Sequence, residues 1–378
     1  MKGDWSTFAK PENATNNRSL KRTNCRISHS TRPSGEQDPL VLMLTRIVSF
    51  EGIPGCEFMR GLPRRLHPPT FIYSGTAMQI CSFLPSATEI LYALGMGESV
   101  SGVTFECDYP PEARQKAIIV DTLIHGDLTP QEIDEAVRRQ AAAGGSLYFV
   151  DLPKLKAIHP DVVITQDLCH VCAISESDLA KAISELPSRP HVISLTPHTL
   201  EQVLQSIETV GLAIGRQSEA RDLIDGLRRR IERVRSNVMQ VKPPRVLCLE
   251  WLSPLFQGGH WIPEMVAIAG GDALLATPGE RSTNISWEQV LESDPEVVVV
   301  MPCGFHLKEA IAQYRNSCFP KDWINVSAVR HRRVYAVDGT AYFSRPGPRL
   351  VTGLEILQAI LRDDSFAELP AGSVAKII

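Results

Sequence analysis

Long apolar runs are missing from this sequence of 378 residues, and so are the sequence patterns of several enzyme classes. No stretch approaches the roughly 18 consecutive apolar residues that indicate a membrane-spanning helix, so we expect no membrane span. G-x-G-x-x-G after a strand, G-x-x-x-x-G-K-[ST], G-x-S-x-G and H-E-x-x-H are also absent. These absences argue against a nucleotide cofactor and against enzymes that depend on those motifs.

The sequence also lacks a recognisable secretory signal. The first 30 residues are polar and lack the apolar segment that follows the basic residues of a signal peptide. The chain has nine cysteines, an odd number, which is more typical of a reducing compartment than of a disulfide scaffold. We therefore expect a cytoplasmic protein, or a periplasmic one if the true N-terminus differs.

Positive charge is scarce outside the N-terminal region. Residues 1–75 carry 11 Lys and Arg against 6 Asp and Glu, whereas the remaining residues carry 28 against 37. Sequence-independent nucleic-acid binding needs clustered positive charge. The acidic body therefore predicts no nucleic-acid partner.

The sequence predicts an α/β protein that begins at Met78. Residues 1–77 are rich in Asn, Ser, Thr, Arg, Pro and Gly, which predicts a poorly ordered extension. After Met78, short β-rich runs alternate with helical patterns, as in parallel sheets flanked by helices. Ser86-Ala-Thr-Glu89 and Ser286-Trp-Glu-Gln289 have the spacing of a helix capping box. Strands are predicted at 80–83, 100–105, 118–120, 162–166, 191–195, 246–250, 297–300 and 334–337, and helices at 262–269 and 348–361.

A long helical segment separates two similar lobes. Residues 199–239 keep a helical periodicity that is interrupted only near Gly215, so this segment is long enough to connect two lobes. We expect two Rossmann-like lobes with parallel sheets, joined by a single long helix, with a ligand cleft between them at the carboxyl ends of their strands. The predicted boundaries are 1–77 for the extension, 78–196 for the N-terminal lobe, 197–242 for the helical linker, 243–364 for the C-terminal lobe and 365–378 for a tail.

One loop of the first lobe combines thiols with an imidazole. Cys169, His170 and Cys172 follow the strand predicted at 162–166. Such residues suit one side of a zinc or copper site, or a redox pair. The alternative is two ordinary cysteines on a buried turn, because no second Cys-x-x-Cys completes four ligands. Asp167, at the end of the strand, is better placed as a polar ligand contact.

Other strand-end loops carry aromatic and acidic side chains. Residues 105–111 of the first lobe, Phe-Glu-Cys-Asp-Tyr-Pro-Pro, are suited to frame a cleft, the alternative being a solvated turn. In the second lobe, Trp251, Phe256 and Trp261 suit a flat or bulky organic ligand, and we assign one of the three rings to core packing. Residues 341–349 precede the last helix, and the alternative for their arginines is local pairing or solvation only.

The chain resembles the cobalamin-binding proteins of the periplasmic-binding-protein superfamily, in which a rigid helix joins two lobes. The resemblance runs from about Met78 to Arg362, and its motifs are specific for the superfamily but less so for the ligand, since relatives bind iron chelates, haem or metal ions. It implies a binding protein without chemistry of its own and a small movement of the lobes on binding. The resemblance rests on Ser82-Phe-Leu-Pro-Ser-Ala-Thr-Glu-Ile-Leu, Cys107-Asp-Tyr-Pro-Pro-Glu-Ala, Pro160-Asp-Val-Val-Ile, Ser253-Pro-Leu-Phe-Gln-Gly-Gly, Ala269-Gly-Gly-Asp-Ala-Leu-Leu, Ser286-Trp-Glu-Gln-Val-Leu and Ser344-Arg-Pro-Gly-Pro-Arg-Leu.

The resemblance also implies individual roles. Phe256 matches an aromatic residue that touches the corrin, Tyr342 stands where the family has a tryptophan, and Glu288 matches a glutamate that docks onto an ABC permease. The matching first-lobe glutamate is replaced by Pro153, with Asp151 two residues away. Polar residues around Gln166 and Glu106 replace aromatic residues of the family's cleft, which leaves the ligand and the permease open.

Cobalamin or a related corrinoid is therefore the expected ligand of a monomeric protein whose partner is an ABC permease or an intracellular acceptor protein. The alternatives are a metal-chelate or haem receptor on the same fold, and a thiol-dependent redox or metal-binding protein. The expected metal ligands for that last alternative are Cys169, His170 and Cys172. The expected ligand-binding residues are Ser86, Phe105, Glu106, Cys107, Asp108, Gln166, Asp167, Cys169, His170, Trp251, Phe256, Trp261, Tyr342, Phe343 and Arg345.

Overall fold

A computed structural model describes residues 78–123, 132, 135–136, 139–140, 147–166, 176–239 and 241–378. These residues belong to one compact unit, Thr70–Ile378, which contains two lobes. The extension predicted at 1–77 lies outside the described residues. The loop that carries Asp167, Cys169, His170 and Cys172 lies outside them too.

The first lobe is built on a sheet with the strand order β4-β3-β2-β1-β5-β6. All neighbouring strands are parallel except β4, which runs antiparallel to β3. The central strands are buried on both faces because helices cover the sheet, as expected for a parallel sheet. The strands are β1 (Ile80–Ser82), β2 (Val100–Thr104), β3 (Ala117–Thr122), β4 (Tyr148–Val150), β5 (Val162–Thr165) and β6 (His191–Ser194), and the helices are α1 (Pro85–Ala93), η2 (Gly97–Ser99), η3 (Pro111–Gln115), α3 (Leu152–Ile158), α4 (Glu176–Ser184) and α5 (Leu200–Ala213).

The second lobe has the strand order β12-β11-β10-β7-β8, with β9 paired to β7. Both edge strands of this order, β8 and β12, are antiparallel to their neighbours, so the sheet is mixed rather than purely parallel. The strands are β7 (Arg245–Leu252), β8 (Leu255–Gln257), β9 (Asp272–Ala273), β10 (Val297–Val300), β11 (Val334–Val337) and β12 (Val374–Lys376), and the helices are α7 (Ile262–Ile268), α8 (Trp287–Ser293), α9 (Leu307–Asn316), η4 (Lys321–Asn325), α10 (Ser327–Arg330), α11 (Gly339–Tyr342) and α12 (Leu350–Arg362).

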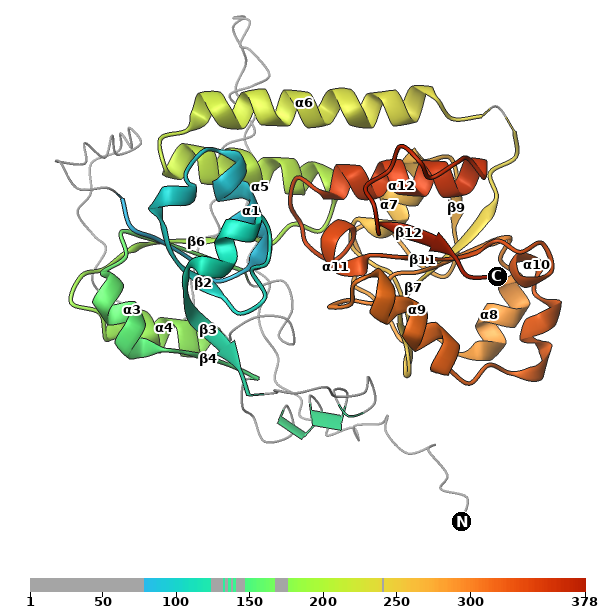
Figure 1. Cartoon of the computed structure of the whole chain (residues 1–378), viewed down its shortest axis with the longest axis horizontal. Coiled ribbons are helices and arrows are strands. Elements are labelled where there is room, and N and C mark those ends of the chain that lie inside the picture. The colour runs from blue at the N-terminus through green and yellow to red at the C-terminus, as the bar shows by residue number, and fades with distance from the viewer. Residues whose placement is uncertain are drawn as a thin grey trace, which may run out of the picture. The chain divides into compact units, whose positions relative to one another are not determined.

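Two helices, rather than one, occupy the segment predicted as a continuous linker. The chain turns at Gly215, whose φ of +72° is readily adopted by glycine, and this turn separates α5 from α6 (Gln217–Ser236). Helix α5 packs on α1 and belongs to the first lobe, whereas α6 packs on α5 and on α12 of the second lobe (Figure 1). The connection between the lobes is therefore α6 and the residues that follow it.

An apolar core continues from one lobe to the other along these helices. Helix α6 buries one stripe, and the same cluster of buried side chains includes residues of α1, α5, α7 and α12. Separate clusters fill the outer sides of the two sheets. The continuous core predicts that the lobes move little relative to each other on the helical side. The buried stripe of α6 consists of Ala220, Ile224, Leu227, Ile231 and Val234.

One of the two predicted capping boxes is wrong and the other is confirmed. Helix α1 begins at Pro85 after Leu84, without a side-chain cap, and the carboxylate of Glu89 binds arginines instead of a backbone N–H. Helix α8 begins after Ser286, and the reciprocal bonds between Ser286 and Gln289 are present. The spacing alone cannot distinguish a cap from an acid that has a distant partner.

The segment predicted as a tail also contributes to the fold. Strand β12 lies within residues 365–378 and pairs antiparallel with β11. Tyr335 of β11 pairs with Lys376, and Val337 pairs with Val374. Residues 374–376 are therefore part of the second sheet.

Candidate functional site

The carboxyl ends of the two sheets face each other. Asp108 follows β2 of the first lobe, whereas His306 follows β10 and Asp338 follows β11 of the second lobe. The His306 ring bridges the two lobes, since Nδ1 lies 2.9 Å from Asp338 Oδ2 and Nε2 lies 3.3 Å from Asp108 Oδ2. Open parallel sheets bind ligands at these ends, so this interface locates the candidate site.

The arginines of the segment before α12 bind the first lobe. Arg345 Nη1 donates to Asp108 Oδ1 at 2.5 Å, and Nη2 donates to the carbonyl oxygen of Glu106 at 2.8 Å. Arg349 binds Glu89 of α1 and lies 4.0 Å from the centre of the Tyr109 ring. Local pairing, the sequence-based alternative for these arginines, is therefore wrong, because their carboxylate partners are in the other lobe.

Burial and charge act against each other on the acids of this interface. Burial raises the pKa of Asp108, but the charge and hydrogen bond of Arg345, with His306 and Arg349 nearby, lower it by more, so the pKa is below its usual value. Burial raises the pKa of Glu106, and the charge of Arg345 only partly offsets this. Asp108 is therefore a firmly charged anchor, whereas Glu106 is a half-buried carboxyl that protonates more readily.

Aromatic side chains surround this polar interface on both lobes. Trp251 on β7 and Phe256 on β8 are directly paired across the two strands, and the Trp251 and Phe305 ring centres lie 5.5 Å apart. These rings and Tyr342 are half-buried, so part of each surface remains open. Phe105, after β2, is 38% exposed and stacks on Tyr148. The predicted Gln166 is half-buried at the end of β5.

Four residues predicted to contact a ligand are buried instead. Trp261 and Phe343 are 4% and 2% exposed, and the Trp261 indole N–H donates to the Phe343 carbonyl oxygen at 2.8 Å. Ser86 lies buried in the first turn of α1. Cys107 is buried, with its sulfur 3.1 Å from the hydroxyl oxygen of Thr88. These placements correct the prediction, because buried side chains offer little surface to a ligand; Ser86 is covered in part by Gly347 of the second lobe.

Three of the described cysteines, Cys81, Cys107 and Cys248, are poor candidates for thiol chemistry because they are buried. Burial raises the pKa of Cys107 despite its hydrogen bonds, and it raises the pKa of Cys81 and Cys248 to about 12. These thiols stay protonated at neutral pH, and the thiolate is the reactive form. Within the described residues, no group of three or more His, Cys, Asp or Glu side chains is arranged to hold a metal ion. Cys169, His170 and Cys172 lie outside those residues.

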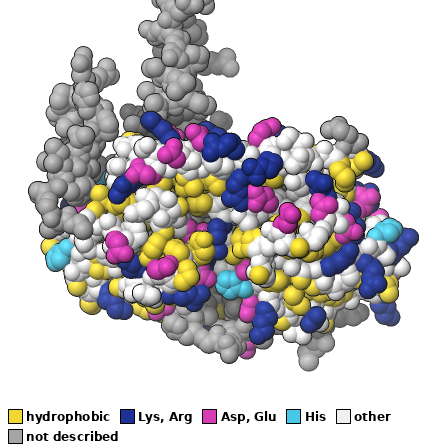
Figure 2. All heavy atoms as spheres, turned by 45° about the horizontal axis from the view of Figure 1, so that its top comes forward, with side chains coloured by type: hydrophobic (Ala, Val, Ile, Leu, Met, Phe, Trp, Pro, Cys, Tyr) yellow, Lys and Arg dark blue, Asp and Glu magenta, His cyan; other side chains and the backbone are white. Residues whose placement is uncertain are grey.

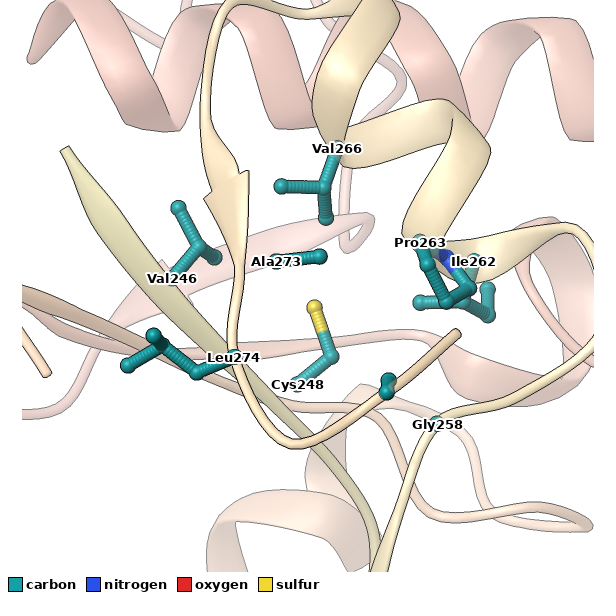
Figure 3. Close-up of a pocket in the computed structure, with 9 residues that line it drawn as sticks. Val246, Cys248, Gly258, Ile262, Pro263, Val266, Ala273 and Leu274 are labelled. Carbon is teal, nitrogen blue, oxygen red and sulfur yellow. The ribbon is translucent and has the colours of Figure 1, made fainter. Parts of the chain in front are cut away.

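Two hollows are lined by other residues than this interface: one lies in the core of the second lobe, and the other lies between the lobes. The sulfur of Cys248 points into a gap near Val266 and Ala273 that has no room for a water molecule, so this gap is a packing feature of the core (Figure 3). A recess of about 440 Å³ lies between His198 and residues 275–283 and is also lined by Gln257. Neighbouring residues of a strand point to opposite faces, so Gln257 points away from the side of β8 that presents Phe256.

Glu288 and Asp151, which the resemblance compares with the family's docking glutamates, differ in the contacts of their carboxylates. Glu288 is exposed in the first turn of α8, where its own backbone N–H and then Ser286 lower its pKa. Asp151 caps α3 through the backbone N–H of Lys154, and it also pairs with the Lys154 ammonium at 2.8 Å. Glu288 is therefore an exposed carboxylate that is bonded only within its own helix turn, whereas Asp151 is also paired with an ammonium group.

The surface of the described region is mixed in charge. Figure 2 shows basic and acidic side chains interspersed over the helical side of the described residues. None of the helices in the described residues is both long and apolar enough to cross a membrane. The face in view therefore presents no large patch of a single charge.

Sequence reasoning missed several residues of the interface. Glu89 and Arg349 lie inside motifs that carry the resemblance, but the sequence does not show that they bind each other. His306, Asp338 and Phe305 follow the predicted strands at 297–300 and 334–337. Their positions after strand ends are the signal that identifies them as candidates.

Comparisons with known proteins agree with this architecture. The "Uncharacterized ABC transporter substrate-binding lipoprotein YvrC" of Bacillus subtilis is 26% identical over 300 residues, which cover 77% of this chain and 82% of that protein. A vitamin B12-binding protein of Vibrio cholerae is 24% identical over 304 residues, covering 79% of this chain and 93% of that protein. The structure of the periplasmic heme-binding protein RhuT from Roseiflexus sp. RS-1 matches with a TM-score of 0.57 at 22% identity, covering 76% of this chain and 99% of that one.

The family comparison covers both lobes. A family model described as "Periplasmic binding protein" matches residues 80–341, from β1 of the first lobe to α11 of the second. This match spans more than half of the sequence and agrees with the two-lobe fold seen in the heme-binding structure. The chain therefore belongs to the periplasmic binding protein family.

Proposed function

We propose that this protein is a non-enzymatic solute-binding protein that holds a corrinoid, with cobalamin the leading candidate, between its two lobes. The observation that carries the proposal is the set of half-buried aromatic rings, Trp251, Phe256, Phe305 and Tyr342, at the carboxyl end of the second sheet. Aromatic rings bury a large apolar area at a small loss of conformational entropy, and this suits a broad, flat ligand.

The chemistry of the interface favours a corrinoid over haem. The edge of haem carries carboxylates, which need free cations, whereas the edge of a corrin carries amides. Two arginines of the interface, Arg345 and Arg349, are already paired with Asp108 and Glu89. Glu106 offers a half-buried carboxyl group whose oxygens accept hydrogen bonds from amides. The names of the relatives, which include both vitamin B12-binding and heme-binding proteins, keep haem as the alternative.

The expected partner is an ABC permease, onto which Glu288 docks. The exposure of Glu288 and the name of the Bacillus subtilis relative support this, and that name also favours export over the cytoplasmic interpretation. Uptake of labelled cobalamin by cells that depend on this chain should fall for Glu288→Gln. Glu292→Gln, which changes an exposed acid one turn further along α8, is the control. Equal uptake by wild type and Glu288→Gln would argue against docking through Glu288.

A ligand titration tests the binding proposal. The purified full chain is mixed with hydroxocobalamin, cobinamide or hemin, and the visible spectrum is followed. A stoichiometric shift with the corrinoids supports the proposal, tighter binding of hemin supports the alternative, and no shift with any of the three overturns both. Cys169→Ser and Cys172→Ser are expected to leave the corrinoid spectrum unchanged, and a changed spectrum would support sulfur–metal contact.

A further inference from the structure

A single carboxylate of the first lobe binds both arginines of the second. Glu89 lies on α1 and its side chain is only 2% exposed. Arg349 Nε donates to Glu89 Oε2 at 2.9 Å and Nη2 donates to Oε1 at 2.5 Å, which makes the pair bidentate. Arg345 Nη1 also lies 3.4 Å from Glu89 Oε1. Glu89 thus binds the segment before α12 to the first lobe through ion pairs with both arginines.

The same two arginines reach the loop that follows β2. Arg345 binds Asp108 and the carbonyl oxygen of Glu106, and Arg349 packs on the Tyr109 ring. The side chains of Arg345 and Arg349 are 10% and 17% exposed, so water competes little for these bonds. Two motifs that are far apart in the sequence therefore recognise each other across the lobes.

Burial makes this contact unlike the ion pairs on the surface. A buried charge that loses its partner is strongly destabilising, whereas exposed ion pairs contribute little. The Arg228–Glu201 pair between α6 and α5 is of the exposed kind, because about half of each side chain is open to solvent. Removing the Glu89 charge leaves Arg349 in an enclosed site, and separation of the lobes is the way to hydrate it.

We propose that Glu89 is a positioning residue, which acts through Arg345 and Arg349 to set the width of the ligand cleft before the ligand arrives. Glu89 is too enclosed to touch a ligand between the lobes. The apolar core holds the lobes together on the helical side, and this cluster holds the facing carboxyl ends of the sheets. The consequence for affinity rests on the proposed function, but the consequence for the distance between the lobes does not.

The distance between the lobes tests the proposal without a ligand. Nitroxides are attached to ketone-bearing amino acids at two exposed positions, Gln115 in the first lobe and Lys321 in the second, so that native thiols stay untouched. Pulsed electron–electron double resonance on the full chain should give one narrow distribution of nitroxide–nitroxide distances. In Glu89→Gln this distribution should become broader and shift to longer distances. Glu201→Gln, the exposed control, should match the wild type. An unchanged distribution in Glu89→Gln would overturn the proposal.

Ligand affinity supplies the second measurement. Glu89→Gln should bind hydroxocobalamin roughly tenfold more weakly, because only part of the population keeps the competent cleft. Arg349→Met should give a similar loss, and the double variant should add little to either, since both changes remove the same contact. A purely structural Glu89 would lower the unfolding midpoint without changing the distance or the affinity of the folded protein, and that result would overturn the proposal.

The two proposals fail in different ways. If the wild type binds neither corrinoid nor hemin, the proposed function falls, and the distance distributions alone decide the role of Glu89. If Glu89→Gln does not fold, Arg349→Met provides the same distance test from the second lobe. Unaltered distances in the folded Arg349→Met variant would then reject the positioning role.

Discussion

The indole N–H of Trp261 donates to the backbone carbonyl oxygen of Phe343 at 2.8 Å, and both side chains lie in the core of the second lobe. Helix α7 begins directly after Trp261, and α11 ends directly before Phe343. The hydrogen bond therefore joins two helix ends that come from distant parts of the sequence. An aromatic residue next to a cleft loop serves here to fix the shape of the lobe.

Trp261→Phe should reduce the free energy of unfolding by about 2 kcal/mol, because it removes a buried hydrogen bond and leaves a small cavity. Corrinoid affinity should stay within about twofold of the wild type, which is well below the tenfold change that about 1.4 kcal/mol produces. Denaturant unfolding and the spectral titration measure the two quantities. A large loss of affinity without loss of stability would indicate that Trp261 contacts the ligand and contradict its role in the core.

Phe256→Ala should show the opposite pattern. Its ring is half-buried on β8 beside Trp251, so we expect roughly a tenfold loss of corrinoid affinity and a small change in the unfolding midpoint. Leu212→Ala is the control, since this apolar side chain is 53% exposed and lies at the end of α5 that is far from the carboxyl end of β6. Equal affinities for Phe256→Ala and the wild type would remove Phe256 from the site.

The thiols provide a test of burial. Burial raises the pKa of Cys81 and Cys248 to about 12, so in the native protein at pH 8 both should resist a disulfide reagent such as Ellman's reagent. Cys318 is exposed and should react at once. Mass spectrometry of the labelled peptides identifies the reacting positions, and unfolding in guanidinium should expose the protected ones. Rapid labelling of Cys248 in the native state would contradict the structure of the second lobe.

The sequence predicted the alternation of strands and helices well, but not the edges of the sheets. The run at 297–300 is four valines, and its boundaries are those of β10. Strands β8 and β12 are only three residues long and antiparallel, and their pairing depends on neighbours that are distant in the sequence. The break at Gly215 was visible as an interruption, yet only the packing of α5 on α1 assigns α5 to the first lobe.

The sequence predicts which positions carry candidate site residues better than it predicts which side chains bind each other. Asp108 and Arg345 are both predicted as site residues, but no periodicity or spacing reveals that they bind each other, because they are 237 residues apart. Similarly, Trp251, Phe256 and Trp261 look equivalent in the sequence, and only the fold shows that Trp261 points into the core. Long-range packing decides such questions, and a single sequence does not contain that information directly.

The pH dependence of stability should reveal His260. Burial, followed by the charges of His198 and Arg281, lowers the pKa of its imidazole from 6.5 to about 4. Between these two values the unfolded chain takes up a proton that the native protein does not, so the free energy of unfolding should fall as the pH drops from about 6.5 to 4. Below about pH 4 both states hold the proton, and this group lowers the free energy of unfolding no further. The effect is moderated because part of the ring remains open to solvent.

His260→Asn tests this assignment, since the left-handed backbone at this position, with a φ of +53°, is well tolerated by asparagine. Guanidinium unfolding midpoints measured from pH 4 to pH 7 should depend less steeply on pH in His260→Asn than in the wild type. His331→Asn changes an exposed histidine and should keep the wild-type slope. Other acids also titrate near pH 4, so the difference between the two slopes, rather than either slope alone, reports on His260. If His260→Asn and the wild type have the same slope, the imidazole of His260 is not held neutral by its surroundings.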